Sequence, residues 1–130
     1  MFDHLTLRVT HYDATKTAYL AALAPLGFAQ VMELTPEQVP DLPGRCLGMG
    51  VGGKPELWLL EVPGPVTATH LALRAENRAQ VDAFHAAAIE AGLTDHGAPG
   101  VRPHYHPNYY GAFVLDADGY NLEAVCHAPE

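Results

Sequence analysis

The sequence has little positive charge, few cysteines and no long apolar run. Seven Lys and Arg against fifteen Asp and Glu give a formal charge of −8. This balance argues against nucleic acid or an anionic membrane as a partner, because phosphate binding needs concentrated Lys and Arg. No apolar run reaches the roughly 18 residues that span a bilayer, and no signal-peptide pattern opens the chain. We therefore expect a cytoplasmic protein.

The two cysteines, Cys46 and Cys126, stand alone, without a CxxC pair. We expect both to be reduced, with Cys126 as a buried structural thiol. The length of 130 residues fits one domain, and a hydrophobic fraction of 48% is enough for a core. Histidine is abundant at eight residues, six of them in the second half. It is the usual metal ligand and the usual proton carrier near neutral pH.

One short pattern occurs twice in the chain. Residues 3–8 read Asp-His-Leu-Thr-Leu-Arg, and residues 69–74 read Thr-His-Leu-Ala-Leu-Arg, so that His, Leu, Leu and Arg recur at an offset of 66 residues. Both copies alternate with a period of two, which predicts strands with His and Arg on one face and the leucines on the other. A histidine at the same place in two repeats suggests a site built between the repeats.

The remaining pattern predicts the order βαβββ twice, an α+β fold in a single domain of residues 1–130. The first unit covers about 1–62, a linker 63–66, and the second unit about 67–127. Strands are predicted at 2–9, 28–34, 46–51, 55–62, 67–75, 110–116 and 120–127. Helices are predicted to begin at the caps Asp13 and Asn77. We expect the proline-containing stretch 95–108 to be irregular.

The closing strands of the two units align at an offset of 65 residues, which places Trp58 and Glu123 in equivalent positions. Two such units would set their first and last strands side by side around a half-open mixed β-barrel. His4, His70 and Glu123 would then converge on its polar lining. Two histidines and a carboxylate suit Zn²⁺, Fe²⁺, Ni²⁺ or Mn²⁺. The alternative is that these are ordinary polar residues on strand faces.

The chain resembles the vicinal oxygen chelate superfamily over nearly its whole length. The resemblance rests on residues 2–9 and 69–73 and on residues 113–123, which are similar to the D-P-D-G-N-x-x-E ending of the family with Ala117 in place of Pro. It implies metal ligands at His4, His70 and Glu123. The family's fourth ligand position falls on Trp58, which cannot bind a metal. The remaining set resembles the His-His-Glu triad of extradiol dioxygenases.

The resemblance implies a small glyoxalase- or dioxygenase-like metalloenzyme. A divalent metal ion (Fe²⁺, Mn²⁺, Zn²⁺ or Ni²⁺) would hold a bidentate oxygen substrate for lyase, isomerase or extradiol-type dioxygenase chemistry. The alternative is a metal-independent protein of the drug-resistance type that binds a small molecule, and a third possibility is a remnant without a site. Family members are frequently dimers, so that we expect a homodimer. The short linker around residues 63–65 favours a site closed within one chain.

The loop at residues 102–110 concentrates two histidines and three tyrosines. As a lid it would supply an acid/base group from His106 or, less directly, His104, with the phenol of Tyr110 near the metal. The alternative is an aromatic seal over the barrel mouth or a dimer contact.

Four further residues are candidates for substrate binding. Trp58 and Tyr109 would form walls of the pocket, and Trp58 would stack on a flat ligand. Arg8 and Arg74 would anchor an anionic substrate, or would pair with acidic neighbours such as Glu123.

Overall fold

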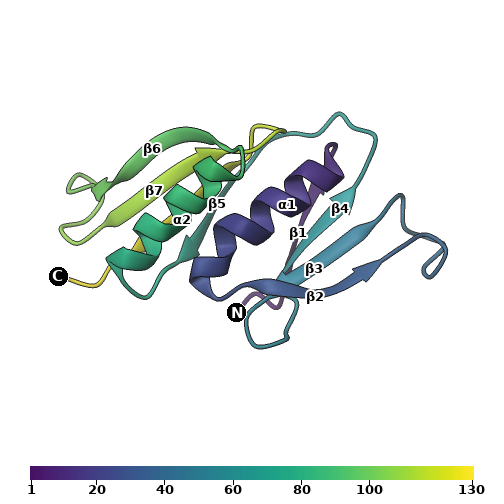
Figure 1. Cartoon of the computed structure of the whole chain (residues 1–130), viewed down its shortest axis with the longest axis horizontal. Helices are drawn as coiled ribbons and strands as arrows, with labels where there is room; N and C mark the ends of the chain where they lie inside the picture. The colour runs from purple at the N-terminus through teal and green to yellow at the C-terminus, as the bar shows by residue number, and fades with distance from the viewer.

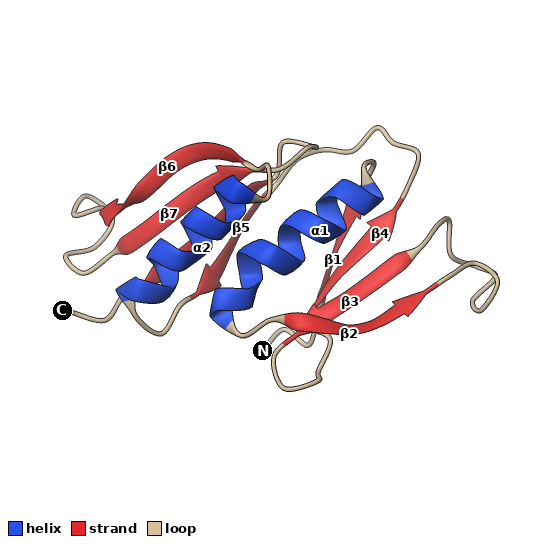
Figure 2. Cartoon of the chain, in the orientation of Figure 1, coloured by secondary structure: helices blue, strands red, loops and turns tan.

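The computed structural model describes residues 1–130 as two four-stranded mixed sheets, each with one helix on one face (Figures 1 and 2). The α+β fold with two βαβββ units is confirmed, and the two sheets are not closed into a barrel. The elements of the first half are β1 (Leu5–Val9), α1 (Tyr12–Leu23), the 3₁₀ turn η1 (Ala24–Leu26), β2 (Ala29–Leu34), β3 (Cys46–Gly50) and β4 (Leu57–Glu61). Those of the second half are β5 (His70–Arg74), α2 (Arg78–Glu90), β6 (Thr94–Val101), β7 (Tyr110–Leu115) and β8 (Asn121–Cys126).

Each sheet pairs its first and last strands in parallel. The strand order is β1-β4-β3-β2 in one sheet and β5-β8-β7-β6 in the other, so that β1 and β5 are edge strands. The register sets Thr6 beside Trp58 in the first sheet and Ala72 beside Glu123 in the second. Since Thr6 and Ala72 hold the same place in the repeat, the predicted equivalence of Trp58 and Glu123 is confirmed.

One hydrophobic core fills the space between the helices and the inner faces of both sheets. Helix α1 forms because apolar residues recur at helical spacing along its inner side. The 3₁₀ turn η1 continues it and ends where Gly27 takes a positive φ of 91°. The helices lie side by side in the middle of the molecule (Figure 1). The other side of each sheet, here called its open face, carries Trp58 in the first half and Glu123 in the second. No helix has the length and apolar character needed to cross a membrane.

The prediction of an irregular stretch at 95–108 is wrong for its first part, where strand β6 pairs with β7. Pro99, Gly97 and Gly100 lie inside this strand and suggested a loop. The strand tolerates them because it is an edge strand, where a proline needs no ladder partner. The pairing shifts register at Gly97 and again before Gly100, as expected for bulges at such residues.

The helix starts and the first strand also differ in detail from the prediction. Strand β1 begins at Leu5, so that His4 lies just before it. Helix α1 begins at Tyr12, and Asp13 therefore stands in its first turn instead of capping it. Asn77 caps α2 as predicted, with its side chain accepting a backbone N–H bond.

Buried and partly buried hydrogen bonds join the second half to the first. The Tyr19 hydroxyl of α1 donates to Asp116 at 2.6 Å, and burial raises the pKa of this phenol above its usual value, which keeps it protonated. Thr10 donates to Asp118 from its backbone N–H at 2.9 Å and from its hydroxyl at 2.5 Å. The Asp-Ala-Asp-Gly turn at 116–119 therefore fastens the two halves together.

We predict that Tyr19→Phe lowers the free energy of unfolding by about 1–3 kcal/mol, because it leaves the buried Asp116 carboxylate without its phenol partner. Tyr110→Phe is the matched control, since Tyr110 donates to Asp82 over the same 2.6 Å but in an exposed position. Its cost should stay below about 1 kcal/mol. Urea denaturation of both variants measures the difference, and equal costs would contradict the fastening role.

Candidate functional site

The most constrained polar group of the open faces is the Glu123 carboxylate. Strand β8 turns Glu123 toward the open face, yet its side chain is 0% exposed. His70, from the neighbouring strand β5, places Nε2 at 2.7 Å from Oε1, and its own ring is half exposed. The Tyr109 hydroxyl donates to Oε2. A fully buried carboxylate needs such partners, because burying it unpaired would be costly.

Tyr109 reaches Glu123 because Gly111 leaves room for its ring. A Cβ on Gly111 would lie 3.1 Å from Tyr109 Cε1 and 3.2 Å from Glu123 Oε2, tighter than most real contacts. Burial, followed by the bond to Glu123, raises the pKa of the Tyr109 phenol well above its usual value, so that it stays a donor. Tyr109 was predicted to be a pocket wall, and its bond to Glu123 was not predicted.

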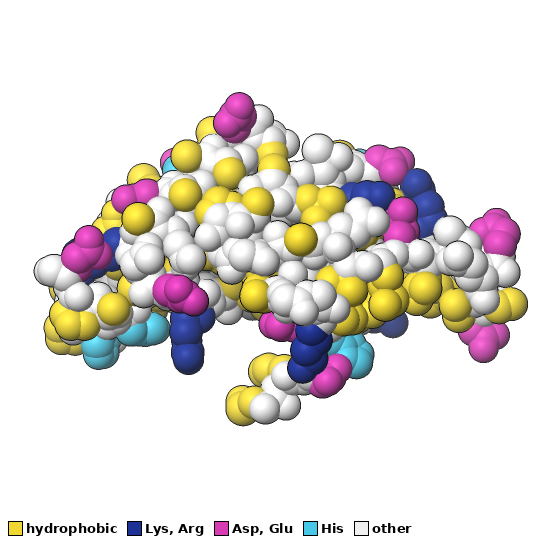
Figure 3. Space-filling model, turned by 60° about the horizontal axis from the view of Figure 1, so that its bottom comes forward, with side chains coloured by type: hydrophobic (Ala, Val, Ile, Leu, Met, Phe, Trp, Pro, Cys, Tyr) yellow, Lys and Arg dark blue, Asp and Glu magenta, His cyan; other side chains and the backbone are white.

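His4 belongs to a different part of the surface. It lies before β1, with Nδ1 at 2.7 Å from an Asp3 carboxylate oxygen. No three His, Cys, Asp or Glu side chains of the chain come close enough together to hold a metal ion. On the face of the molecule shown in Figure 3, the two largest patches of histidine side chains lie apart from each other. His70 and Glu123 are thus brought together and His4 is not, so that one chain alone does not provide the predicted three-ligand site.

Two cavities meet at His4. One, of about 430 Å³, lies on the open face of the first sheet and contains Trp58. The other, of about 320 Å³, lies between the two halves and is lined by residues that include Leu5 of β1 and Leu71, Ala72 and Leu73 of β5. The two edge strands therefore flank a cavity instead of pairing with each other.

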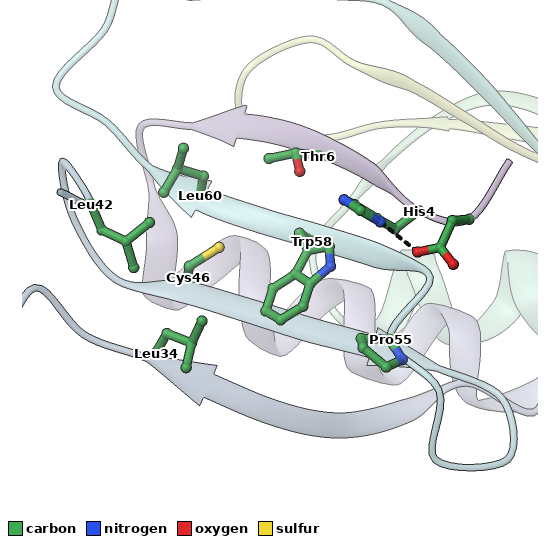
Figure 4. A pocket seen from close by; sticks show the side chains of 9 residues that line it. His4, Thr6, Leu34, Leu42, Cys46, Pro55, Trp58 and Leu60 are labelled. Atoms are coloured by element: carbon green, nitrogen blue, oxygen red, sulfur yellow. Dashed lines mark hydrogen bonds and ion pairs between the residues drawn. The ribbon is translucent and has the colours of Figure 1, made fainter. Parts of the chain in front are cut away.

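Trp58 stands in the middle of the first cavity (Figure 4). Apolar side chains lie on one side of its indole, and His4 and Pro55 lie on the other. The apolar group consists of Leu34, Leu42, Cys46 and Leu60.

The loop at 102–110 forms a layer of rings beside Glu123. His104 lies against Tyr105 with ring centroids 4.1 Å apart, and Tyr105 lies edge-on to Tyr109 at 5.0 Å. His106 and Tyr109 each contact His127 edge-on, at 5.5 and 5.2 Å. Neither His104 nor His106 hydrogen-bonds to Glu123, and each is linked to it only through other rings.

The other predicted residues lie elsewhere. Tyr110 points to the helix side of the second sheet, where its hydroxyl donates to Asp82 at 2.6 Å. It is therefore on the opposite side of the sheet from Glu123. Arg8 lines another cavity, of about 350 Å³. Arg74 ends β5 in an exposed position. Neither arginine lines the cavity of Trp58.

Arg102 and Phe113 belong to the open face of the second sheet and were missed. They line a cavity of about 330 Å³ together with His96, Tyr105 and Asn121. The Arg102 guanidinium lies over the Phe113 ring, 5.5 Å from its centroid. Arg102 could have been recognised as a candidate, because it lies in the loop that is rich in aromatic rings. The place of Phe113 beside Glu123 follows only from the strand register.

Three solved structures show how this fold relates to known proteins. A glyoxalase/bleomycin resistance protein from Albidiferax ferrireducens is 25% identical, with a TM-score of 0.77 over 98% of this chain and 99% of that one. A glyoxalase/bleomycin resistance protein/dioxygenase family enzyme from Burkholderia phytofirmans is 18% identical, with a TM-score of 0.65 over 98% of each chain. A glyoxalase I variant from Zea mays is 22% identical, with a TM-score of 0.71 over 95% of this chain.

The chain spans about half the length of the maize protein, 46% of it. No protein-family model matches the chain. No curated protein matches it either. The likeness to the structures above covers nearly the whole chain and includes both βαβββ units. The chain belongs to the vicinal oxygen chelate superfamily.

We predict that Tyr109→Phe lowers the free energy of unfolding by about 1–3 kcal/mol, because the buried Oε2 of Glu123 loses its donor. Tyr105→Phe is the control, since Tyr105 is 61% exposed and lies in the same loop. Urea denaturation compares the two variants. If Tyr109→Phe costs no more than Tyr105→Phe, the bond to Glu123 does not hold the loop in place.

Proposed function

We propose that this protein is a metal-dependent enzyme of the glyoxalase/dioxygenase type that acts on a small molecule. The observation that carries the proposal is the His70–Glu123 pair, with Nε2 and Oε1 2.7 Å apart on the open face of the second sheet. Imidazole and carboxylate are ligands that Zn²⁺, Fe²⁺, Mn²⁺ and Ni²⁺ accept.

The third ligand, in this proposal, is His4 of the partner subunit in a homodimer. Within one chain His4 forms no group with His70 and Glu123, while the open faces of both sheets carry no helix of their own chain. Placing the first sheet of one copy over the second sheet of another would bring His4 of the first copy to the His70–Glu123 pair of the second. A twofold arrangement would then create two such sites.

When bound, a divalent ion would supply Lewis-acid chemistry to oxygen atoms of the substrate, in a lyase, isomerase or dioxygenase reaction. The residues of this chain would position the substrate and exclude water. The layer of rings in the 102–110 loop supports that role by its place beside Glu123. Proton transfer by His106 or His104 stays a prediction, and Tyr109 is the phenol best placed to take part.

A test of this proposal measures the metal content of the untagged protein and of two single variants, His4→Ala and His70→Ala. Each variant should lose the metal of the wild type. After the two variants are unfolded together and refolded, half of the random dimers are mixed, and each mixed dimer has one site with both histidines intact. About one quarter of the wild-type metal should therefore return.

Two outcomes decide between the arrangements. Metal in the wild type that does not return in the mixture would mean that each site lies within one chain. A wild type that takes up none of the four metals, and gains no thermal stability from them, would overturn the metalloenzyme itself. Thr17→Ala, an exposed change on α1, is a control for the refolding step.

A second candidate function is metal-independent binding of a small molecule. It is favoured by the cavity around Trp58 and by the fact that both oxygens of Glu123 already have hydrogen-bond partners. In that case the cavity would bind its ligand in protein from which metal has been removed. The metal content of the untagged wild type separates the two functions, because only the metalloenzyme takes up one of the four metals.

A further inference from the structure

The indole of Trp58 lies flat on the backbone of strand β3. Gly48 is its partner in the register between β3 and β4. A Cβ on Gly48 would lie only 2.8 Å from Cη2 and Cζ3 of the indole and 3.1 Å from Cε3, so that no larger residue fits beneath the ring. One face of the indole is therefore covered by the strand, and Trp58 as a whole is half-buried. The other face is available to the cavity.

The second half of the chain has the opposite arrangement at the same two positions. There Phe113 stands on the third strand of the unit and pairs with Glu123 on the last strand. In the first half, Gly48 and Trp58 take these places. The position that provides a carboxylate in one sheet thus provides an aromatic surface in the other, which suits two different parts of one ligand.

The lining of the cavity limits what it can hold. Four apolar side chains line the cavity to one side of the indole, and His4 lies on the other side (Figure 4). Thr6 adds a hydroxyl, and Asp3 adds a negative charge. No Lys or Arg lines the cavity. Its volume of about 430 Å³ is within the range of small-molecule sites.

We propose that the substrate carries a flat, uncharged aromatic group that stacks on Trp58, with a hydroxyl or carbonyl oxygen directed toward Thr6 and His4. Stacking needs the open indole face that Gly48 creates, and the leucines cover the edge of the group. An anionic ligand is disfavoured because no Lys or Arg lines the cavity, and Lys54 beside it is already paired with Asp3 at 3.8 Å. The inference rests on the proposed small-molecule function and names its substrate class.

Three probes test this inference: 2-naphthol, its saturated analogue decahydro-2-naphthol, and naphthalene-2-sulfonate. They share a two-ring skeleton and differ in flatness or charge. Calorimetric titration should show that 2-naphthol binds about tenfold more tightly than either of the others, a difference of about 1.4 kcal/mol. Trp58 is the only tryptophan of the chain, so that its single indole N–H signal in an NMR spectrum reports whether the probe binds beside it.

Trp58→Leu should weaken 2-naphthol binding about tenfold and leave the affinity for decahydro-2-naphthol nearly unchanged. Gly48→Ala, which forces the indole off the strand, should act in the same direction, and Thr17→Ala, an exposed change on α1, should have no effect. Equal binding of the flat and saturated probes, tighter binding of the sulfonate, or an unmoved indole signal would each overturn the inference.

The metal measurement keeps this inference separate from the metalloenzyme proposal. Trp58→Leu should retain the metal content of the wild type, because Trp58 is not a ligand, and His70→Ala should lose metal but still bind 2-naphthol. Binding of 2-naphthol by a protein that never takes up metal would leave the aromatic site standing and remove the metalloenzyme.

Discussion

The hydrogen bond between Tyr19 and Asp116 joins the two halves of the chain inside their shared core. Together with the contact between α1 and α2, it holds the helices side by side in the middle of the molecule (Figure 1). Each sheet consequently covers its own helix with one face and leaves the other face open. The positions of Trp58 and Glu123 follow from this arrangement, because both residues stand on open faces. The same arrangement leaves a cavity between β1 and β5 instead of a continuous sheet.

Glu123 shows how one buried charge organises its surroundings. Its two oxygens are satisfied by His70 on one side and Tyr109 on the other, and the loop that carries Tyr109 is held down by this bond and by ring contacts with His127. A metal ion held by Glu123 and His70 would have to replace the hydrogen bond between them, since ligand and proton use the same nitrogen. The proposed metal binding and the present position of the loop would therefore be coupled through one carboxylate.

The sequence predicted most of the fold because its signals were local and repeated. The alternation around His4 and His70, and the offset between the halves, were enough to predict the two units and the equivalence of Trp58 and Glu123. Strand β6 was missed because Pro99 and two glycines suggest a loop unless the strand is known to be at an edge. Tyr109 and Tyr110 are neighbours that alternation sends to opposite faces of the sheet, and composition alone did not distinguish them. The separation of His4 from His70 depends on how the two halves are packed, which no local pattern encodes.

Equivalent positions carry Gly48 and Trp58 in the first half and Phe113 and Glu123 in the second. This difference has a consequence for how such a protein can evolve. In an assembly of identical single units, every unit would have to provide both the aromatic surface and the carboxylate from the same strand position, which is impossible. Fusion of two copies into one chain removes that restriction, because each copy can then change at this position independently. The sheet with Trp58 can adapt to new molecular shapes while the sheet with Glu123 keeps its chemistry. With the proposed function, a duplicated fold of this kind would separate the selection of a ligand from the reaction carried out on it.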